Sequence, residues 1–219
     1  MPVKYDAVFF DFDGTVVDSL QDIVDAVNHT MRQFGLPEFT RDYLQRRLGW
    51  GVRTLMQLSL PADTPEERLN EIIAAYRPYY AAHAGDKSKP FDGIVPMLRR
   101  LKQCGVALAI LSNKPDEALQ PITRRFFSDL VELSAGERAG VRRKPAPDML
   151  EDAATRLGVQ LKRCLYVGDS EVDIDTAVNA GIDCVCVTWG FRTREQLESA
   201  GARVIIDDPA ELIGIVTGE

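Results

Sequence analysis

Short apolar runs separated by helical patterns are the main regularity of this chain. Residues 4–10 (KYDAVFF) combine aromatic and β-branched side chains and end at the turn sequence DFDGT. Such a run predicts a buried strand followed by a loop. Four later runs have the same character, at 106–111, 130–133, 164–167 and 184–187. A further strand is predicted at 202–206 and a final helix at 210–216. Apolar strands that alternate with helices predict an α/β protein whose parallel sheet is covered on both faces.

The segment from residue 19 to residue 85 has a different pattern. Apolar residues recur there at helical spacing, and no strand-like run interrupts them. Ser19 with Asp22 three residues later is typical of a helix start, and residues 85–90 (GDKSKP) are typical of a linker back to the sheet. We therefore expect an α/β core of residues 1–18 and 86–219 with an inserted helical cap of residues 19–85.

Composition and charge exclude several classes of function. A chain of 219 residues, 45% of them hydrophobic, can bury a core without disulfides. The net charge of −7 argues against a nucleic-acid binder. The chain has neither a signal-peptide pattern nor an apolar run that could span a bilayer, so we expect a cytoplasmic protein with no membrane partner. We expect reduced thiols at all four cysteines: Cys104, Cys164, Cys184 and Cys186.

Acidic residues follow two of the predicted strands. Asp11 and Asp13 lie just past the first strand, and Asp169 follows the strand at 164–167. Ligands bind beyond the carboxyl ends of parallel strands, and carboxylates gathered there repel one another unless a cation is present. An all-oxygen set of this kind suits Mg²⁺. Asp173, one helical turn after Asp169, fits either a helix cap or support of the metal site.

Two further positions fit an anion site. Ser112 leaves the strand at 106–111 just before a helix that Pro115 opens, so its hydroxyl and the free N–H groups could hold a phosphate oxygen. An ordinary strand-to-helix turn explains Ser112 equally well. Lys144 precedes a proline and a helical run. It is either a solvated lysine or a cation beside carboxylates and a phosphate.

Four motifs taken in order resemble those of the haloacid-dehalogenase superfamily. They are DFDGT at 11–15, Ser112-Asn113, Lys144-Pro145 and Gly168-Asp169 with Asp173, and the likeness covers nearly the whole chain. The helical segment after the first motif is similar to the cap of the phosphoglycolate phosphatase branch. The resemblance implies a Rossmann-like α/β core with an α-helical cap.

The resemblance also implies a reaction and residue roles. Asp11 would attack phosphorus and form an aspartyl-phosphate, and Asp13 would act as the general acid and base. Mg²⁺ would bind Asp11 and Asp169 together with Asp13, whose backbone carbonyl is the matching ligand, and Asp173 would support this site. The phosphate ligands would be Ser112, Asn113 and Lys144.

The expected function is Mg²⁺-dependent hydrolysis of a small phosphorylated metabolite, most of all 2-phosphoglycolate, by a monomer or homodimer. A β-phosphoglucomutase-like phosphomutase and a pyrophosphatase share the core motifs and stay as alternatives, as does a non-catalytic phosphate-binding module. Residues 46–53 combine glycines with three arginines. We predict that Arg53 contacts a carboxylate of the substrate and that the backbone of Gly51 approaches the substrate closely.

Overall fold

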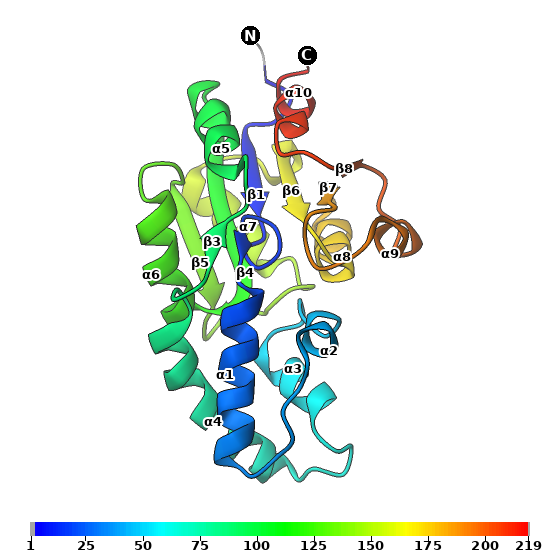
Figure 1. The fold of residues 1–219 in the computed structure, drawn as a ribbon. Coiled ribbons are helices and arrows are strands. Elements are labelled where there is room, and N and C mark those ends of the chain that lie inside the picture. Colours follow the sequence, from blue (N-terminus) through cyan, green and yellow to red (C-terminus); the bar gives the residue numbers. More distant parts are fainter. Residues whose placement is uncertain (1–2, 219) are drawn as a thin grey trace.

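The computed structural model describes residues 3–218 and confirms the predicted α/β architecture. Six strands form a central sheet in the order β5-β4-β1-β6-β7-β8, and every neighbouring pair is parallel (Figure 1). The strands are β1 (Ala7–Phe10), β4 (Ala107–Pro115), β5 (Leu133–Glu137), β6 (Cys164–Gly168), β7 (Asp183–Val187) and β8 (Ile205–Ile206). Because β1 lies between β4 and β6, the residues that follow these three strands meet at one edge of the sheet.

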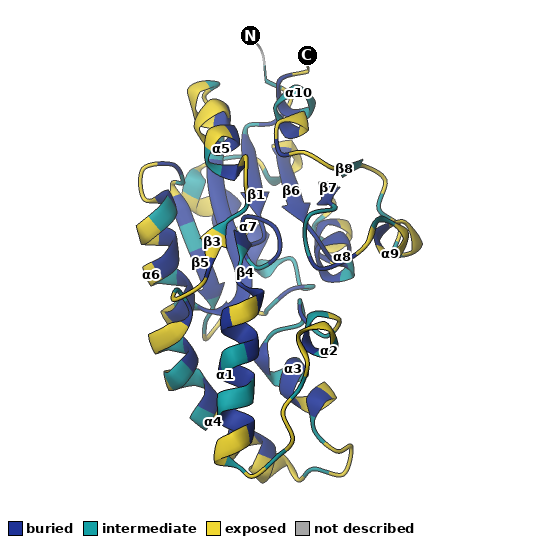
Figure 2. Ribbon diagram, viewed as in Figure 1, coloured by how far each residue is buried: buried dark blue, intermediate teal, exposed yellow. Residues whose placement is uncertain are grey.

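Helices cover both faces of the sheet, which explains why the strands are apolar throughout. Val8 and Phe10 of β1 pack in one cluster with α5 (Ile94–Gln103), α6 (Asp116–Phe127) and α10 (Glu211–Thr217). Ala7 and Phe9 pack on the other face with α7 (Asp148–Leu157) and α8 (Glu171–Ala180). A short helix, α9 (Arg194–Ser199), and a 3₁₀ turn, η1 (Leu161–Arg163), complete this part. Figure 2 shows the buried sheet and the exposed outer faces of the helices.

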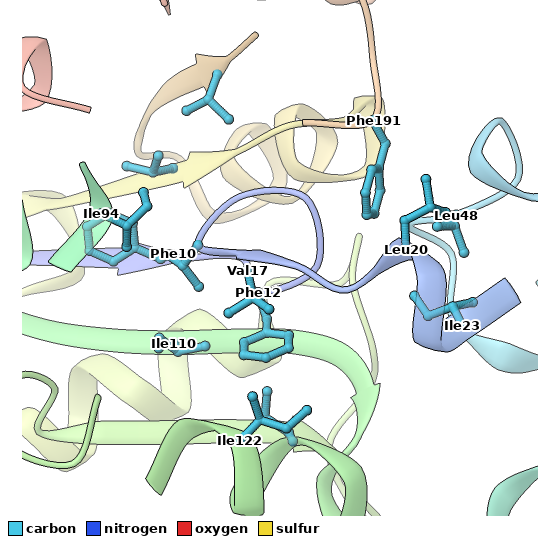
Figure 3. Close-up of a cluster of buried hydrophobic side chains, with 14 of the residues drawn as sticks. Phe10, Phe12, Val17, Leu20, Ile23, Leu48, Ile94, Ile110, Ile122 and Phe191 are labelled. Atoms are coloured by element: carbon cyan, nitrogen blue, oxygen red, sulfur yellow. The ribbon is translucent and has the colours of Figure 1, made fainter. Parts of the chain in front are cut away.

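Four helices lie within residues 19–85, beyond the carboxyl ends of the strands (Figure 1), and we call this segment the cap. They are α1 (Leu20–Gln33), α2 (Arg41–Gln45), α3 (Val52–Ser59) and α4 (Glu66–His83). The chain enters the cap through β2 (Val17–Asp18) and leaves it through β3 (Lys89–Pro90), and these two strands pair antiparallel. The first apolar cluster runs from Phe10 in the sheet to Leu20 and Ile23 in α1, so core and cap share packing (Figure 3).

Helix α1 begins directly after Ser19, as predicted. Ser19 makes no side-chain capping bond, however, because its hydroxyl donates to Asp13 Oδ1 at 2.5 Å. Asp22 is buried and accepts hydrogen bonds from the N–H groups of Lys87 and Ser88 and from the Ser88 hydroxyl. The Asp22 carboxylate therefore ties the first cap helix to the returning linker.

Two predicted boundaries also shift. The strand predicted at 130–133 begins only at Leu133, because the N–H groups of Leu130 and Val131 still bond to Phe127 at the end of α6. Strand β4 continues through Pro115, so α6 begins at Asp116. The four cysteines are free thiols, as predicted. Within residues 3–218, no helix combines the length and apolar character that crossing a membrane requires.

Candidate active site

A cavity lies between the carboxyl ends of the strands and the cap. Its volume is about 50 Å³. The core contributes its polar wall, and the cap contributes a mainly apolar wall with two tyrosines. The lining residues are Asp11, Asp13, Ser112, Asn113, Lys114 and Pro115 from the core, and Ile23, Leu48, Gly49, Gly51, Val52, Leu55, Tyr76 and Tyr80 from the cap.

Three buried carboxylates gather at this edge of the sheet. Oxygen atoms of Asp11, Asp169 and Asp173 lie within 4.8 Å of one another. The residues are 4%, 1% and 0% exposed, respectively. Asp11 follows β1 and Asp169 follows β6, and these strands are hydrogen-bonded neighbours, so the fold brings the two acids together. The structure thus joins the first and fourth sequence motifs.

The Lys144 ammonium lies among these acids. Its Nζ is 2.7 Å from Asp11 Oδ1 and 2.8 Å from Asp173 Oδ1, and it donates to the Tyr166 hydroxyl at 2.9 Å. Burial lowers the pKa of Lys144, but the two carboxylates outweigh burial and hold the pKa above its ordinary value. These partners use all three donors of the ammonium. Lys144 therefore neutralises carboxylates here, and direct contact with a phosphate stays a prediction.

One ammonium does not balance three carboxylates. Burial raises the pKa of Asp11 to about 7, with Lys144 opposing this rise and Asp173 adding to it. Burial, followed by the charges of Asp173 and Asp11, raises the pKa of Asp169 well above its ordinary value. A hard divalent cation would offset this repulsion through the oxygen ligands it prefers.

Asp173 and Asp169 differ in their capacity to bind a cation. Asp173 accepts five hydrogen bonds, from the N–H groups of Asp169 and Ser170, the Ser170 hydroxyl, Lys144 and Tyr166. These bonds saturate its carboxylate. Asp169 accepts only from the Thr15 hydroxyl at 3.1 Å and the Phe191 N–H at 2.7 Å, among the described residues. Asp11 and Asp169 are thus the carboxylates that fit Mg²⁺, while Asp173 holds their surroundings in place.

Glycines make room for the Asp169 carboxylate. A Cβ added at Gly14 or Gly190 would overlap its side chain. Gly14 also has a φ of +88°, a conformation that L side chains rarely adopt. The turn in the first motif therefore needs glycine both for its backbone and for the space beside the predicted metal ligand.

The Asp13 carboxylate lies outside the three-acid cluster, although the sequence analysis grouped Asp13 with Asp11 and Asp169. Its Oδ1 accepts from the Ser19 hydroxyl and from Lys114 Nζ, the latter at 2.9 Å. These two donors hold the Asp13 carboxylate apart from the cluster. The predicted metal ligand at this position is the backbone carbonyl of Asp13. Asp13 lines the cavity and is positioned to exchange a proton with a bound molecule.

Lys114 is a cavity residue that sequence reasoning missed. It is 4% exposed, and besides Asp13 it contacts the Tyr80 hydroxyl of α4. Its place in SNKP, two residues after Ser112 at a strand end, was the only available signal. Because a lysine in a turn is usually solvated, that signal was weak.

The two residues of the second motif have different surroundings. Ser112 is buried, lines the cavity and accepts a hydrogen bond from the Lys114 N–H at 3.2 Å. The Asn113 amide donates to the carbonyls of Gly49 and Lys144 and accepts from the Lys144 N–H. The Asn113 side chain, predicted to bind phosphate, thus connects β4 to the Lys144 loop and to the cap.

Of the two predicted substrate contacts in the cap, Gly51 lines the cavity and Arg53 does not. The Arg53 guanidinium pairs with Glu66 and donates to Asn70 Oδ1 at 2.9 Å. The physical reason is that α4, which packs beside α3, presents an acid and an amide one helical turn apart. This arrangement does not support contact between Arg53 and the substrate.

A core arginine holds the cap loop over the site. Arg192 donates to the carbonyls of Gln45 at 3.2 Å and Leu48 at 2.9 Å. It also pairs with Glu171 through two donors, at 2.8 and 2.9 Å. The indole N–H of Trp50 donates to the same Glu171 carboxylate at 3.2 Å. Core and cap are therefore joined on the side opposite the β2–β3 connection as well (Figure 1).

Comparison with known proteins identifies the family. The family model of the haloacid dehalogenase-like hydrolases matches residues 8–187. The chain belongs to this family. The phosphoglycolate phosphatase of Xanthomonas campestris pv. campestris is 33% identical over 94% of this haloacid dehalogenase-like hydrolase and 94% of the relative. The N-acetylmuramic acid 6-phosphate phosphatase of Pseudomonas aeruginosa is 30% identical over 98% of this chain and 96% of that protein.

Solved structures agree with this result. The crystal structure of a candidate phosphoglycolate phosphatase from Lactobacillus delbrueckii subsp. bulgaricus has a TM-score of 0.92 and 36% identity to this chain. The match covers 98% of this hydrolase and 99% of that protein. These findings confirm the family, the fold and the class of enzyme predicted from the four motifs: the chain is a phosphatase of the haloacid dehalogenase-like family.

Proposed function

We propose that this phosphatase hydrolyses 2-phosphoglycolate, with Mg²⁺ as cofactor and an aspartyl-phosphate on Asp11 as intermediate. The observation that carries the proposal is the position of Asp11, whose buried carboxylate lines the cavity 2.7 Å from Lys144. Phosphoryl transfer depends mainly on positioning and charge neutralisation, so a carboxylate fixed beside a cation suits the role of nucleophile. The activity named for the Xanthomonas relative supports the same substrate.

The residues around Asp11 take separate roles in the proposed reaction. Asp11 attacks phosphorus, and the leaving alcohol departs with a proton from Asp13, which lines the same cavity. Asp13 then takes a proton from the water that cleaves the acyl phosphate, which restores Asp11 and releases inorganic phosphate. Ser112 holds a phosphate oxygen. Asp11, Asp169 and the Asp13 carbonyl would hold Mg²⁺, which would supply positive charge for the phosphate when bound.

The lining of the cavity on the cap side supports a small leaving group that is not a sugar. The apolar side chains of Leu48, Val52 and Leu55 in the cavity wall offer no hydrogen bonds to sugar hydroxyls. N-acetylmuramic acid 6-phosphate, the substrate named for the Pseudomonas relative, is a sugar phosphate of this kind.

A panel of phosphate esters, assayed by phosphate release, tests the substrate and the metal. We expect 2-phosphoglycolate to give the highest kcat/KM and excess EDTA to abolish turnover. A higher kcat/KM on pyrophosphate would reassign the substrate, and so would net conversion of a sugar phosphate to its isomer. Full turnover in EDTA would refute the Mg²⁺ requirement.

Asp11→Asn tests covalent catalysis. The amide is nearly isosteric but does not attack phosphorus, so turnover should fall by more than the roughly 10²–10⁴-fold that acid–base assistance alone supplies. Asp175→Asn, at an exposed acid of α8, is the matched control and should keep wild-type turnover. Circular dichroism checks that both variants are folded. A rate for Asp11→Asn above about a hundredth of wild type would contradict the nucleophilic role.

A further inference from the structure

Lys114 places a buried positive charge in the wall of the cavity. Among the described residues that line the cavity, it is the one that carries such a charge. Its side chain is 1% exposed, and its ammonium contacts Asp13 Oδ1 at 2.9 Å and the Tyr80 hydroxyl. An ammonium has three donors, so these two contacts leave one donor for a bound molecule.

The contact with Asp13 places Lys114 beside the leaving group. Asp13 is the proposed proton donor to the leaving oxygen, so the groups next to Asp13 surround the part of the substrate that departs. The cap wall of the cavity contributes apolar side chains, such as Val52 and Leu55, and the Tyr80 hydroxyl contacts Lys114. An anion bound against such a wall is stable only if a cation accompanies it. Lys114 supplies that cation.

We propose that Lys114 binds a carboxylate on the leaving alcohol and thereby selects short phosphorylated hydroxy acids over neutral esters of equal size. The inference rests on the proposed function, because it takes Asp13 as the group at the leaving oxygen. Recognition of the substrate carboxylate, which the sequence predicted for Arg53, is thereby assigned to Lys114 at the end of β4.

A pair of esters isolates the carboxylate. The substrate 2-phosphoglycolate and the neutral ester 2-hydroxyethyl phosphate have similar chains and differ in one charged group. Wild-type enzyme should prefer the acid, and Lys114→Met should lower kcat/KM for the acid about 10- to 100-fold more than for the neutral ester. The loss should come mainly from a higher KM. The quantity compared is the ratio of the two kcat/KM values measured on one protein sample, so a smaller folded fraction does not change it.

Two control variants separate charge from structure. Lys114→Arg keeps the positive charge and should keep a preference for the acid, even if both rates fall. Lys87→Met removes an exposed lysine that pairs with Asp25 in the cap and does not line the cavity. It should leave the acid-to-neutral ratio at the wild-type value.

The outcomes distinguish this inference from the proposed function. Equal losses on both esters in Lys114→Met would show that Lys114 acts only through Asp13, and would overturn the inference while 2-phosphoglycolate stays the substrate. A wild-type preference for 2-phospholactate that Lys114→Met removes would support Lys114 and refute 2-phosphoglycolate. Equal wild-type rates on acid and neutral esters would overturn the inference for any substrate.

Discussion

Replacing Lys144 with methionine should destabilise the protein strongly. Lys144 Nζ lies 2.7 Å from Asp11 and 2.8 Å from Asp173, and its side chain is 1% exposed. Methionine has a similar length but no charge, so both carboxylates would stay buried without their cation. Removing one partner of a buried ion pair costs about 3–5 kcal/mol, and we expect a loss of this size in the free energy of unfolding.

Urea unfolding near neutral pH in excess EDTA measures this loss without a contribution from bound metal. Lys87→Met is the matched control, because its Nζ is 2.6 Å from Asp25 but the two side chains are 58% and 40% exposed. Exposed pairs contribute about 0–1 kcal/mol, so this variant should be nearly as stable as wild type.

A second substitution separates charge from packing. Adding Asp173→Asn to Lys144→Met removes one of the unpaired carboxylates, so the double variant should be more stable than Lys144→Met alone. If instead the fit of the side chain mattered most, the double variant would lose further stability. A loss below about 1 kcal/mol in Lys144→Met, or a double variant less stable than the single one, would refute the electrostatic argument.

Three further predictions follow from contacts of the cap. Asp22→Ala leaves buried donors of the linker, including the Ser88 N–H, without an acceptor, and urea unfolding should show a loss of about 2–4 kcal/mol. Arg192→Met frees the loop that carries Trp50, so kcat/KM should fall about 10-fold and tryptophan fluorescence should shift. An unchanged kcat/KM and an unchanged fluorescence spectrum would show that Arg192 does not hold this loop. Arg53→Ala breaks contacts within the cap, and kcat/KM for 2-phosphoglycolate should change less than about threefold; a large rise in KM would return Arg53 to the substrate site.

The positions of the two central acids could be predicted from the sequence because they follow from the backbone. Strands buried on both faces are apolar along their length, so the first polar residue marks the strand end. Asp11 and Asp169 are these markers for β1 and β6, and the parallel pairing of the strands brings them together. The local sequence, together with the rule that ligands bind at the carboxyl ends of strands, was therefore sufficient to predict where these two acids lie.

The partners of the flexible side chains could not be predicted in the same way. Lys114 contacts Asp13 across 101 positions of the chain, and Asp22 contacts Ser88 across 66 positions. Neither contact leaves a periodic pattern in the sequence. The first joins side chains at the ends of the neighbouring strands β1 and β4, and the second depends on how the cap meets the linker. Arg53 shows the same limit: its glycine-rich neighbourhood suggested a ligand, but the carboxylate it meets belongs to Glu66 on the next helix.

The pairing of β2 with β3 has a consequence for how such an enzyme diversifies. Val17 pairs with Pro90 and Asp18 with Lys89, so the inserted segment begins and ends at neighbouring points of the core. A short turn could close that gap without rethreading any strand of the main sheet, and insertions are tolerated where their two ends lie close together. The cap is therefore an exchangeable module. Descendants could replace it and acquire other substrates, while the strand that carries Asp11 keeps the same chemistry.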